Sequence, residues 1–367
     1  MTLRDYLNFL QHKSVAVIGI GVSNTPLIQL LLDNGIDLTA CDKRSREDLG
    51  KLGDELEKKG CKLQLGENYL QGLHQDIIFR TPGLRPDVPE LLAAIEQGSV
   101  LTSEMEVFFE VCPCPIIAVT GSDGKTTTTT IIAELLKAAG NTVHVGGNIG
   151  NPLLCEADTM KPTDYAVLEL SSFQLMTMSR SPHIAVVTNL APNHLDMHHG
   201  MEEYVAAKEN IFRHQSGDDI AVFNLDNDIT REQSSRAVGK MLQFSRREEP
   251  AEGVFLRGED IIVRKNGVER KLMMTGDIRI PGVHNVENYM AAIAAVDGLV
   301  DDDVIVRFAR EFGGVEHRIE CVRTYHGVKF YNDSIASSPS RCIAGLRSFT
   351  QKVILIAGGY DKHIPFD

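Results

Sequence analysis

A glycine-rich loop that contains a lysine and two threonines is the strongest chemical signal in the sequence. The loop follows an apolar run at Ile116–Val119 and precedes a predicted helix at Thr127–Ala139. Glycines let backbone N–H groups approach phosphate oxygens, and a helix N-terminus adds partial positive charge. The pattern predicts a nucleotide-phosphate site, in which Lys125 contacts the β- and γ-phosphates and Thr126 contacts the metal ion. The residues assigned to this site are Gly121, Ser122, Asp123, Gly124, Lys125, Thr126 and Thr127.

The spacing within this loop departs from the common phosphate-loop pattern. Only Ser122 and Asp123 separate the two glycines, where the common pattern has four residues. The alternative is an ordinary glycine turn with a surface lysine. The strand before the loop and the helix after it favour the phosphate site.

Two side chains that suit a metal ion follow predicted strands of the same region. Glu169 ends the strand that begins at Tyr165, and the carboxyl ends of parallel strands are where such sheets bind ligands. Its assigned role is metal binding, with helix capping as the alternative. His194 follows the strand predicted at Ile184–Leu190 and is either a metal ligand or a structural histidine.

The neighbouring basic residues have simpler expected roles. We expect His198 and His199 to be solvated loop residues. Lys208 lies in the helical stretch Tyr204–Phe212. Its simplest role is a surface charge, because a free ammonium group would repel Mg²⁺.

Two further glycine loops lie at predicted strand ends. The segment Gly146–Gly150, with Asn148 at its centre, allows close approach of the backbone to a ligand. Near the N-terminus, Gly19 and Gly21 form part of a dinucleotide-binding pattern, and Asp42 lies near the distance expected for a ribose-binding acid. The third glycine of that pattern is absent, so it suits a diphosphate on a helix N-terminus without establishing one.

Composition restricts the class of protein. The 367 residues carry a net charge of −13 and no basic stripe, which argues against a nucleic-acid-binding face. Hydrophobic content of 43% and charged content of 24% are typical of a globular protein. No apolar run is long enough to span a membrane. The seven cysteines are scattered, and Cys112 and Cys114 lack zinc-finger spacing, so we expect reduced thiols and a cytoplasmic protein.

The elements that must position these residues form an α/β fold with parallel sheets. Near-continuous apolar runs suit strands covered on both faces. A strand at 15–18, a helix at 26–34 and a strand at 38–41 make a first βαβ unit. Alternating segments between 255 and 280 predict an antiparallel extension of the central sheet. We expect three units, at 1–112, 113–314 and 315–367.

The third unit is expected to be incomplete. Its predicted elements are a hairpin at 319–324 and 328–332, a helix at Pro339–Leu346 and a strand at Val353–Ala357. One helix and a few strands do not close a parallel sheet, so its apolar face should be under-covered.

In their order along the whole chain, these motifs resemble the Mur ligases of peptidoglycan synthesis. The segment Glu169–Leu175 points to the D-glutamate-adding branch of that family. The phosphate loop is shared with all Mur ligases and with folylpolyglutamate synthases. The matching segments are Gly19–Gly21, Thr81–Gly83, Thr120–Thr126, Gly146–Gly150, Glu169–Leu175, Asn193–Asp196, Ala207–Lys208, Gly282–Asn288, His317–Arg318, Asn332–Ser334 and Gly358–Gly359.

The resemblance implies a three-domain, ATP-dependent ligase: a Rossmann-like domain, a central ATPase-type domain and a C-terminal domain for the amino acid. Its substrates would be UDP-N-acetylmuramoyl-L-alanine and D-glutamate, joined through an acyl phosphate. Its cofactors would be ATP and Mg²⁺ at two sites, and it would act as a monomer. Lys208 corresponds to a lysine that is carbamylated in the family, a modification that turns an ammonium into an anionic oxygen ligand.

The remaining site residues follow from the same resemblance. Glu169, His194 and Lys208 would serve magnesium ions together with Thr126. The nucleotide would also contact Asn285, Asn288, Arg318 and Asp333. The UDP-linked substrate would contact Gly19, Gly21, Val22, Ser23, Asp42, Asn148 and His194. Lys362 would approach the amino acid.

Two features depart from the family pattern. Ile335 stands where the family commonly has a lysine, and we hypothesise that Arg341 supplies the missing charge near the acidic substrate. The sequence ends at Asp367, before the positions of later residues that bind D-glutamate in the family.

Three other functions compete with this interpretation. One is a related ligase that adds another amino acid, or glutamate to a folate; Phe173 and Gln174 argue against a folate substrate. Another is a nucleotide-binding regulator, or a chain that binds its ligands without turnover. A nicotinamide dehydrogenase is the weakest, because the third glycine is missing and ATP-binding features follow.

Overall fold

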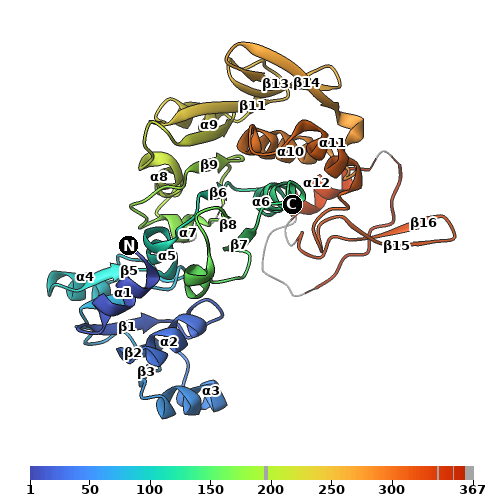
Figure 1. The fold of residues 1–367 in the computed structure, drawn as a ribbon. Coiled ribbons are helices and arrows are strands. Elements are labelled where there is room, and N and C mark those ends of the chain that lie inside the picture. Colours follow the sequence, from blue (N-terminus) through green and yellow to red (C-terminus); the bar gives the residue numbers. More distant parts are fainter. Residues whose placement is uncertain (194–196, 337–338, 350, 360–367) are drawn as a thin grey trace.

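A computed structural model describes residues 1–193, 197–336, 339–349 and 351–359. Within these residues the chain forms a parallel sheet, a larger and mostly parallel sheet, and a hairpin. The two sheets follow each other along the long axis, and the hairpin projects to one side (Figure 1). The predicted α/β class with parallel sheets is confirmed. No helix in the described ranges combines the length and the apolar character needed to cross a bilayer.

The first sheet is parallel and five-stranded, in the order β3-β2-β1-β4-β5. Its central strand is the apolar run that the sequence indicated, and it is almost entirely buried. The strands are β1 (Ser14–Ile18), β2 (Asp37–Asp42), β3 (Lys62–Leu65), β4 (Ile77–Phe79) and β5 (Val100–Thr102). The helices are α1 (Leu3–Leu10), α2 (Asn24–Asp33), α3 (Arg46–Lys58), α4 (Pro89–Glu96) and α5 (Glu104–Val111).

The central sheet has nine strands, in the order β14-β13-β12-β11-β10-β9-β6-β8-β7. The strands from β12 to β7 run parallel, and β13 and β14 add the predicted antiparallel extension. The strands are β6 (Ile116–Thr120), β7 (Val143–Gly147), β8 (Tyr165–Glu169), β9 (Ile184–Val187), β10 (Ile220–Asn224), β11 (Lys240–Ser245), β12 (Gly253–Arg257), β13 (Asp260–Lys265) and β14 (Val268–Met274).

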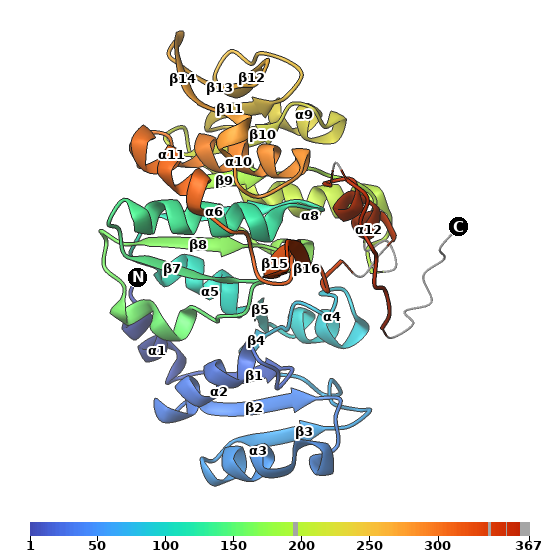
Figure 2. The same ribbon diagram turned by 90° about the vertical axis from the view of Figure 1, so that its right-hand side faces the viewer.

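Helices cover both faces of the central sheet. The elements between its strands and after them are α6 (Lys125–Ala138), η1 (Leu154–Thr159), α7 (Ser172–Leu175), α8 (Met201–Arg213), α9 (Asp228–Ser234), η2 (Thr275–Asp277), α10 (Val283–Val296) and α11 (Asp302–Glu311). Helices α6 and α10 lie side by side on one face (Figure 2). The other face packs on α5, η1 and α8, in a hydrophobic core that continues into the first sheet.

The alternating directions of side chains along the central strands explain why the central sheet contributes to two hydrophobic cores, one on each face. On β6, Ile117 and Val119 point to the core with α6 and α10, while Ile116 and Ala118 point to the core shared with the first sheet. Successive side chains of a strand face opposite sides, so a strand that is apolar throughout must be covered twice. The carboxyl ends of β6, β8 and β9 are thereby held at one edge of a rigid, double-covered sheet.

The region after residue 314 is less covered. It contains a hairpin of β15 (Glu320–Tyr325) and β16 (Val328–Asn332) and the helix α12 (Pro339–Leu346), as predicted. The strand expected at Val353–Ala357 is not formed, and this prediction was wrong. Ile354 and Ile356 are 94% and 91% exposed, and no described strand pairs with the segment. An extended segment becomes a strand only when a neighbour accepts and donates its backbone hydrogen bonds.

Candidate functional site

The glycine-rich loop joins the carboxyl end of β6 to the first turn of α6. Gly124 has a φ of 79° and immediately precedes Lys125, the first residue of α6. A side chain at Gly124 would overlap Asn288, and one at Gly121 would overlap Thr188. Both positions therefore require glycine. The loop backbone consequently lies directly at the N-terminus of a long helix, where an anion is favoured.

Neutral hydrogen bonds hold this loop in place. The Ser122 hydroxyl donates to the carbonyl oxygen of Ala191 and accepts the Ala191 N–H, each at 2.9 Å. The Asp123 N–H donates to the side-chain oxygen of Asn189 at 3.1 Å. These partners follow β9, the strand next to β6, so two adjacent strand ends fix one loop. The backbone is thus preorganised before any ligand binds.

Lys125 lies over the loop. Its Nζ donates to the carbonyl oxygens of Gly121 and Ser122, at 3.0 Å each. The ammonium group is therefore placed at the concave side of a glycine turn, where phosphate oxygens would replace these weak partners. The arrangement fits the predicted contact with phosphate.

Glu169 is the carboxylate nearest to this loop. It ends β8, the strand beside β6, and is 2% exposed. Its Oε2 accepts the Thr126 hydroxyl at 2.6 Å, and its Oε1 accepts the Asn148 amide at 2.7 Å. Arg318 donates to the same Thr126 hydroxyl at 2.9 Å. The structure thus brings four predicted residues, from four separate segments, into contact.

These oxygens suit a hard divalent cation. Magnesium is bound by one or two carboxylates together with substrate phosphates and water. Glu169 is a buried anion whose two oxygens receive only neutral donors in the described part of the chain, and the hydroxyl of Thr126 lies beside it. The oxygens of Glu169 and Thr126 therefore fit the predicted Mg²⁺ site.

Lys208 is buried instead of lying on the surface. It is 2% exposed, and its Nζ donates to the Thr120 hydroxyl and the Gly121 carbonyl, both at 3.0 Å. Burial holds the pKa of this amine well below its usual value, Lys125 lowers it further, and Glu169 opposes the shift. No ion pair of Lys208 is found within the described ranges. The surface-charge alternative is therefore excluded, and an amine is held beside the phosphate loop.

The start of α10 faces the loop from the other side. Asn288 accepts a hydrogen bond from Thr128 at 3.3 Å and donates to Asn285 at 3.2 Å. Both asparagines are buried, as is Thr127. Asp333, on the chain after β16, accepts the Ile319 N–H at 3.2 Å, and its burial raises its pKa. Asn285 and Asn288 thus join the site, while Asp333 is placed by the hairpin region.

Four predicted residues are histidines or lie near the chain end. His194 and Lys362 lie outside the described residues, so their assigned roles stay predictions. His198 was expected to be solvated, and this prediction was wrong. The residue is 4% exposed, and its ring stacks on Phe173 with ring centres 5.1 Å apart and contacts the Ser172 hydroxyl at 2.9 Å. An aromatic partner on α7 accounts for its burial. His199 is exposed, as expected.

The first sheet carries the second glycine loop. Gly19, with a φ of 90°, follows β1 and lies against Thr81. Asp42, at the end of β2, accepts the Ile20 N–H at 2.7 Å and binds Arg44 at 2.9 Å. Burial acts to raise the pKa of this carboxyl, but these hydrogen bonds outweigh it and lower the pKa to about 2. The loop residues that follow are Gly21, Val22 and Ser23, and they are exposed.

A narrow cleft lies between the glycine loop of the first sheet, at Ser23, and the Gly146–Gly150 loop of the central sheet, at Gly147. It lies between the first sheet and the central sheet and contains two charged residues that the sequence did not single out, Arg80 and Glu104. Arg80 is 1% exposed and donates across the junction to the Phe173 carbonyl at 3.1 Å and the Thr177 hydroxyl at 3.2 Å. Its position directly after β4 and before Thr81-Pro82-Gly83 is the feature of the sequence that could have identified it as a site residue.

Glu104 is the second charged residue of the cleft. Its Oε1 accepts the Leu154 N–H at 2.9 Å. Burial raises the pKa of this carboxyl to about 7, although the Leu154 hydrogen bond lowers it. Glu104 begins α5 and Leu154 begins η1, so this contact also joins the first unit to the central sheet.

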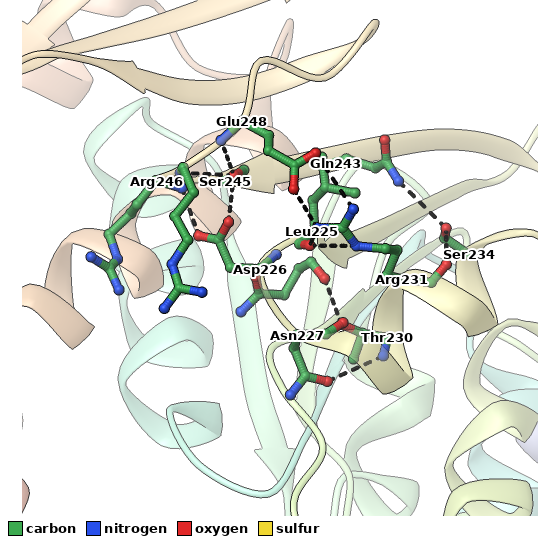
Figure 3. A network of polar contacts seen from close by, with 12 residues as sticks. Leu225, Asp226, Asn227, Thr230, Arg231, Ser234, Gln243, Ser245, Arg246 and Glu248 are labelled. Atoms are coloured by element: carbon green, nitrogen blue, oxygen red, sulfur yellow. Dashed lines mark hydrogen bonds and ion pairs between the residues drawn. The ribbon is translucent and has the colours of Figure 1, made fainter.

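A second polar cluster lies at the carboxyl ends of β10 and β11 (Figure 3). We call it the Asp226 network. Asp226 accepts the Ser245 hydroxyl at 2.5 Å and the Arg246 N–H at 2.7 Å. Arg231 donates to the Leu225 carbonyl at 2.7 Å. Asn227 caps α9 through the Thr230 N–H at 3.1 Å. Each of these groups has a partner within the network, which indicates a structural role.

Comparison with known proteins agrees with this geometry. Residues 119–296 match the family model described as the Mur ligase middle domain. A UDP-N-acetylmuramoylalanine–D-glutamate ligase of Acetivibrio thermocellus is 57% identical over 366 residues, which is 100% of this chain and 78% of the relative. A protein of the same name from Clostridium novyi is 51% identical over 367 residues, which is 100% of this chain and 79% of the relative.

Solved structures share the fold at lower identity. The UDP-N-acetylmuramate–alanine ligase MurC of Thermotoga maritima aligns with a TM-score of 0.55 and 23% identity, over 92% of this chain and 77% of that one. A murein peptide ligase from Psychrobacter arcticus aligns with a TM-score of 0.53 and 17% identity, over 93% and 77%. The chain therefore belongs to the Mur ligase family, in the branch whose curated members carry the name UDP-N-acetylmuramoylalanine–D-glutamate ligase.

Proposed function

We propose that this chain is an ATP-dependent ligase that adds D-glutamate to UDP-N-acetylmuramoyl-L-alanine in the synthesis of peptidoglycan precursors. The observation that carries the proposal is the convergence of Lys125, Glu169 and Lys208 on one glycine loop at the carboxyl edge of the central sheet. The names of relatives at 51–57% identity supply the substrates. The α/β fold alone would not, because one fold serves many reactions.

The phosphate chain of ATP would lie in the loop from Gly121 to Thr127. Its backbone N–H groups and the N-terminus of α6 favour the anion, and Lys125 neutralises the phosphate that is transferred. Asn285 and Asn288 border the same loop from α10. We assign Arg318 to the nucleotide because it already contacts Thr126. Asp333 retains the role of a nucleotide contact as a prediction.

Magnesium would be held by Glu169 and Thr126. When bound, the ion would neutralise phosphate charge and align the transferred group. We expect a second ion near Lys208, provided that this amine becomes a carbamate. An uncharged amine adds to carbon dioxide, forming a carbon–nitrogen bond and releasing a proton. The burial of Lys208 beside neutral oxygens favours the uncharged form that this addition needs.

The UDP-linked substrate would extend from the first sheet to the central sheet. Its diphosphate would lie on the loop from Gly19 to Ser23, at the start of α2, and Asp42 would lie beside the nucleoside. The cleft between the sheets would carry the sugar towards Asn148. His194 would contact the same substrate and a metal ion, and Lys362 would approach D-glutamate. These contacts are predictions.

The reaction needs two successive bond exchanges. A carboxylate oxygen of the alanyl group attacks the γ-phosphorus of ATP, and ADP leaves. The amine of D-glutamate then attacks the acyl carbon, phosphate leaves, and the amine loses a proton. Both steps bring anions together, so catalysis consists largely of charge neutralisation and alignment. Closing the domains would exclude water from the acyl phosphate.

The replacement of the family lysine by Ile335 bears on the amino-acid substrate. Ile335 is 42% exposed and offers no charge to an acidic substrate. Arg341 lies in the first turn of α12, two residues after Pro339. Its side chain lies outside the described part of the structure. Its compensating role therefore stays a hypothesis, which fails if Arg341→Ala leaves the Michaelis constant for D-glutamate unchanged.

The direct test is release of inorganic phosphate from ATP with each substrate omitted in turn. We expect release that needs both UDP-N-acetylmuramoyl-L-alanine and D-glutamate, and much slower release with UDP-N-acetylmuramic acid. Release that is independent of the UDP-linked substrate would refute the ligase assignment. In parallel, ¹³C NMR in labelled bicarbonate should give a carbamate signal that Lys208→Met abolishes; its absence would refute the modification alone.

A further inference from the structure

Two cysteines meet at the connection between the first sheet and the central sheet. Cys112 caps α5, Cys114 precedes β6, and Pro113 stands between them. The backbone leaves α5 in an extended conformation at Cys112, with φ −62° and ψ 121°. Side chains two residues apart in an extended segment point to the same side. The two sulfur atoms accordingly lie 3.5 Å apart, and all seven cysteines of the chain are free thiols.

The two thiols differ in access and in acidity. Cys112 is partly exposed, while Cys114 is 2% exposed and belongs to the hydrophobic core. The hydrogen bond with Cys114 lowers the pKa of the Cys112 thiol, against the effect of its own burial. The same contact, together with burial, raises the pKa of Cys114. The more exposed cysteine is thus also the one whose pKa is lowered, as an attacking thiol requires.

We propose that Cys112 and Cys114 form a redox-active dithiol, which a low-molecular-weight disulfide oxidises to an intramolecular disulfide. The Cys112 thiolate attacks one sulfur of the external disulfide, and one thiolate of that molecule leaves. The Cys114 thiol then loses its proton and attacks the Cys112 sulfur of the mixed disulfide, and the second thiol leaves. The two cysteines are oxidised, and the external disulfide is reduced to two thiols.

The neighbouring geometry favours the second step over a lasting mixed disulfide. Cys114 already contacts the sulfur that it must attack, since the two Sγ atoms lie 3.5 Å apart. Pro113 restricts the backbone between them and keeps the sulfur atoms near each other. The disulfide would close a very short loop, and the entropic stabilisation from so short a loop is small. The modification should therefore be visible in reactivity far more than in thermal stability.

The dithiol is separate from the proposed ATP site. Cys114 lies at the amino end of β6, while the phosphate loop begins after Thr120 at its carboxyl end. The chain also contains a matched negative control. Cys41 and Cys61 are buried, and burial raises the pKa of Cys41 to about 12 and that of Cys61 to about 11. These two thiols should not react under conditions that oxidise the dithiol.

Mass spectrometry after incubation with oxidised glutathione tests the proposal on the unmodified chain. The tryptic segments between Arg80 and Lys125 contain Cys112 and Cys114 and no other cysteine. We expect this region to lose the mass of two hydrogen atoms, and dithiothreitol to restore it. An unchanged dithiol, or glutathione retained on Cys112, would overturn the proposal.

Single variants test the assigned roles. Cys114→Ser should retain glutathione on Cys112, because nothing resolves the mixed disulfide, whereas Cys112→Ser should leave the buried Cys114 unmodified. The converse pattern would overturn the assignment. As a measurement that needs no variant, phenylarsine oxide, which bridges two adjacent thiols, should protect this region from alkylation. Equal alkylation with and without the arsenical would also count against an adjacent dithiol.

Discussion

Two polar clusters occupy the same edge of the central sheet and differ in how their charges are satisfied. In the Asp226 network, Asp226 and Arg231 receive partners from neighbouring backbone and side chains (Figure 3). Around the phosphate loop, Glu169 and Lys208 are buried with neutral partners only, within the described ranges. Burying a charge without a counter-charge is costly. The phosphate loop therefore holds a carboxylate that a ligand can satisfy and an amine whose pKa is lowered by burial, whereas the Asp226 network is complete.

We expect the largest difference in reaction rate between variants of the two clusters when Lys125 is replaced. Lys125→Ala removes the cation over the loop, so phosphate release should fall by about a hundredfold to a thousandfold, as for loss of an electrostatic group at a reacting centre. Steady-state kinetics measures it. Lys137→Ala, on the same helix with a side chain 44% exposed, is the control and should retain the rate. Equal losses of rate in both variants would show that Lys125 has no special role in the reaction.

Lys208 tests whether its cluster is built for a ligand or for stability. Lys208→Met replaces a buried amine by an apolar side chain of similar length, so thermal stability should be kept or improved. Phosphate release should nevertheless fall more than about tenfold, because the carbamate proposed above could no longer form. A joint measurement of the melting temperature and the rate checks this. A variant that unfolds but keeps its rate per folded molecule would show that Lys208 is structural.

Glu104 lies outside both clusters and tests the cost of burying a carboxyl group that has no charged partner. Its pKa is raised by burial to about 7 in the folded chain, against about 4.3 when unfolded. The folded state therefore binds more protons between these values, and Glu104 costs stability increasingly as the pH rises from about 4 to about 7. Glu104→Gln keeps an acceptor for Leu154 and should gain roughly 3–4 kcal/mol at pH 8 but little at pH 4.

Denaturant unfolding at the two pH values measures this gain. Glu110→Gln is the matched control, since it lies on the same helix with a side chain 36% exposed. We expect no comparable pH dependence of the difference for that variant. If Glu104→Gln were destabilising at pH 8, the carboxylate would have a charged partner, and the account of its burial would be wrong.

The smallest effect is expected in the Asp226 network. Asp226→Asn leaves two donors, the Ser245 hydroxyl and the Arg246 N–H, opposite an amide that accepts only one of them. Stability should fall by about 1–2 kcal/mol, with no change in ATP affinity. Urea unfolding measures the first quantity. Asp218→Asn, at an exposed position whose side chain makes no hydrogen bond within the described part of the chain, should change neither.

The sequence predicted the central strands well because their signal is local. Apolar runs such as Ile116–Val119 end in glycine or polar residues. The loop and the helix start that follow differ from the strand in composition, so the strand end can be recognised. The sequence analysis missed β3 in the first sheet and β11 in the central sheet, because both strands begin with exposed residues and are only partly buried. The expected strand at Val353–Ala357 failed for the opposite reason. Its composition suits a strand, but pairing depends on a neighbour that composition does not supply.

The site was predictable in its motifs but not in its long-range contacts. The residue types of Gly121, Lys125 and Glu169, and their positions at strand ends, indicate a phosphate and metal site from sequence alone. The sequence does not indicate that Lys208 is buried, because a lysine on an amphipathic helix is usually solvated. Arg80 and Glu104 likewise gain their significance from packing between two units that are distant in sequence.

Calorimetric titration with ATP in the presence of Mg²⁺ tests the central claim most directly, with Lys125→Ala and Asp226→Asn measured beside the unmodified chain. The account predicts saturable binding that Lys125→Ala weakens by at least about tenfold and Asp226→Asn leaves unchanged. Binding that is lost in Asp226→Asn and kept in Lys125→Ala would contradict it, because the nucleotide would then lie at the carboxyl ends of β10 and β11.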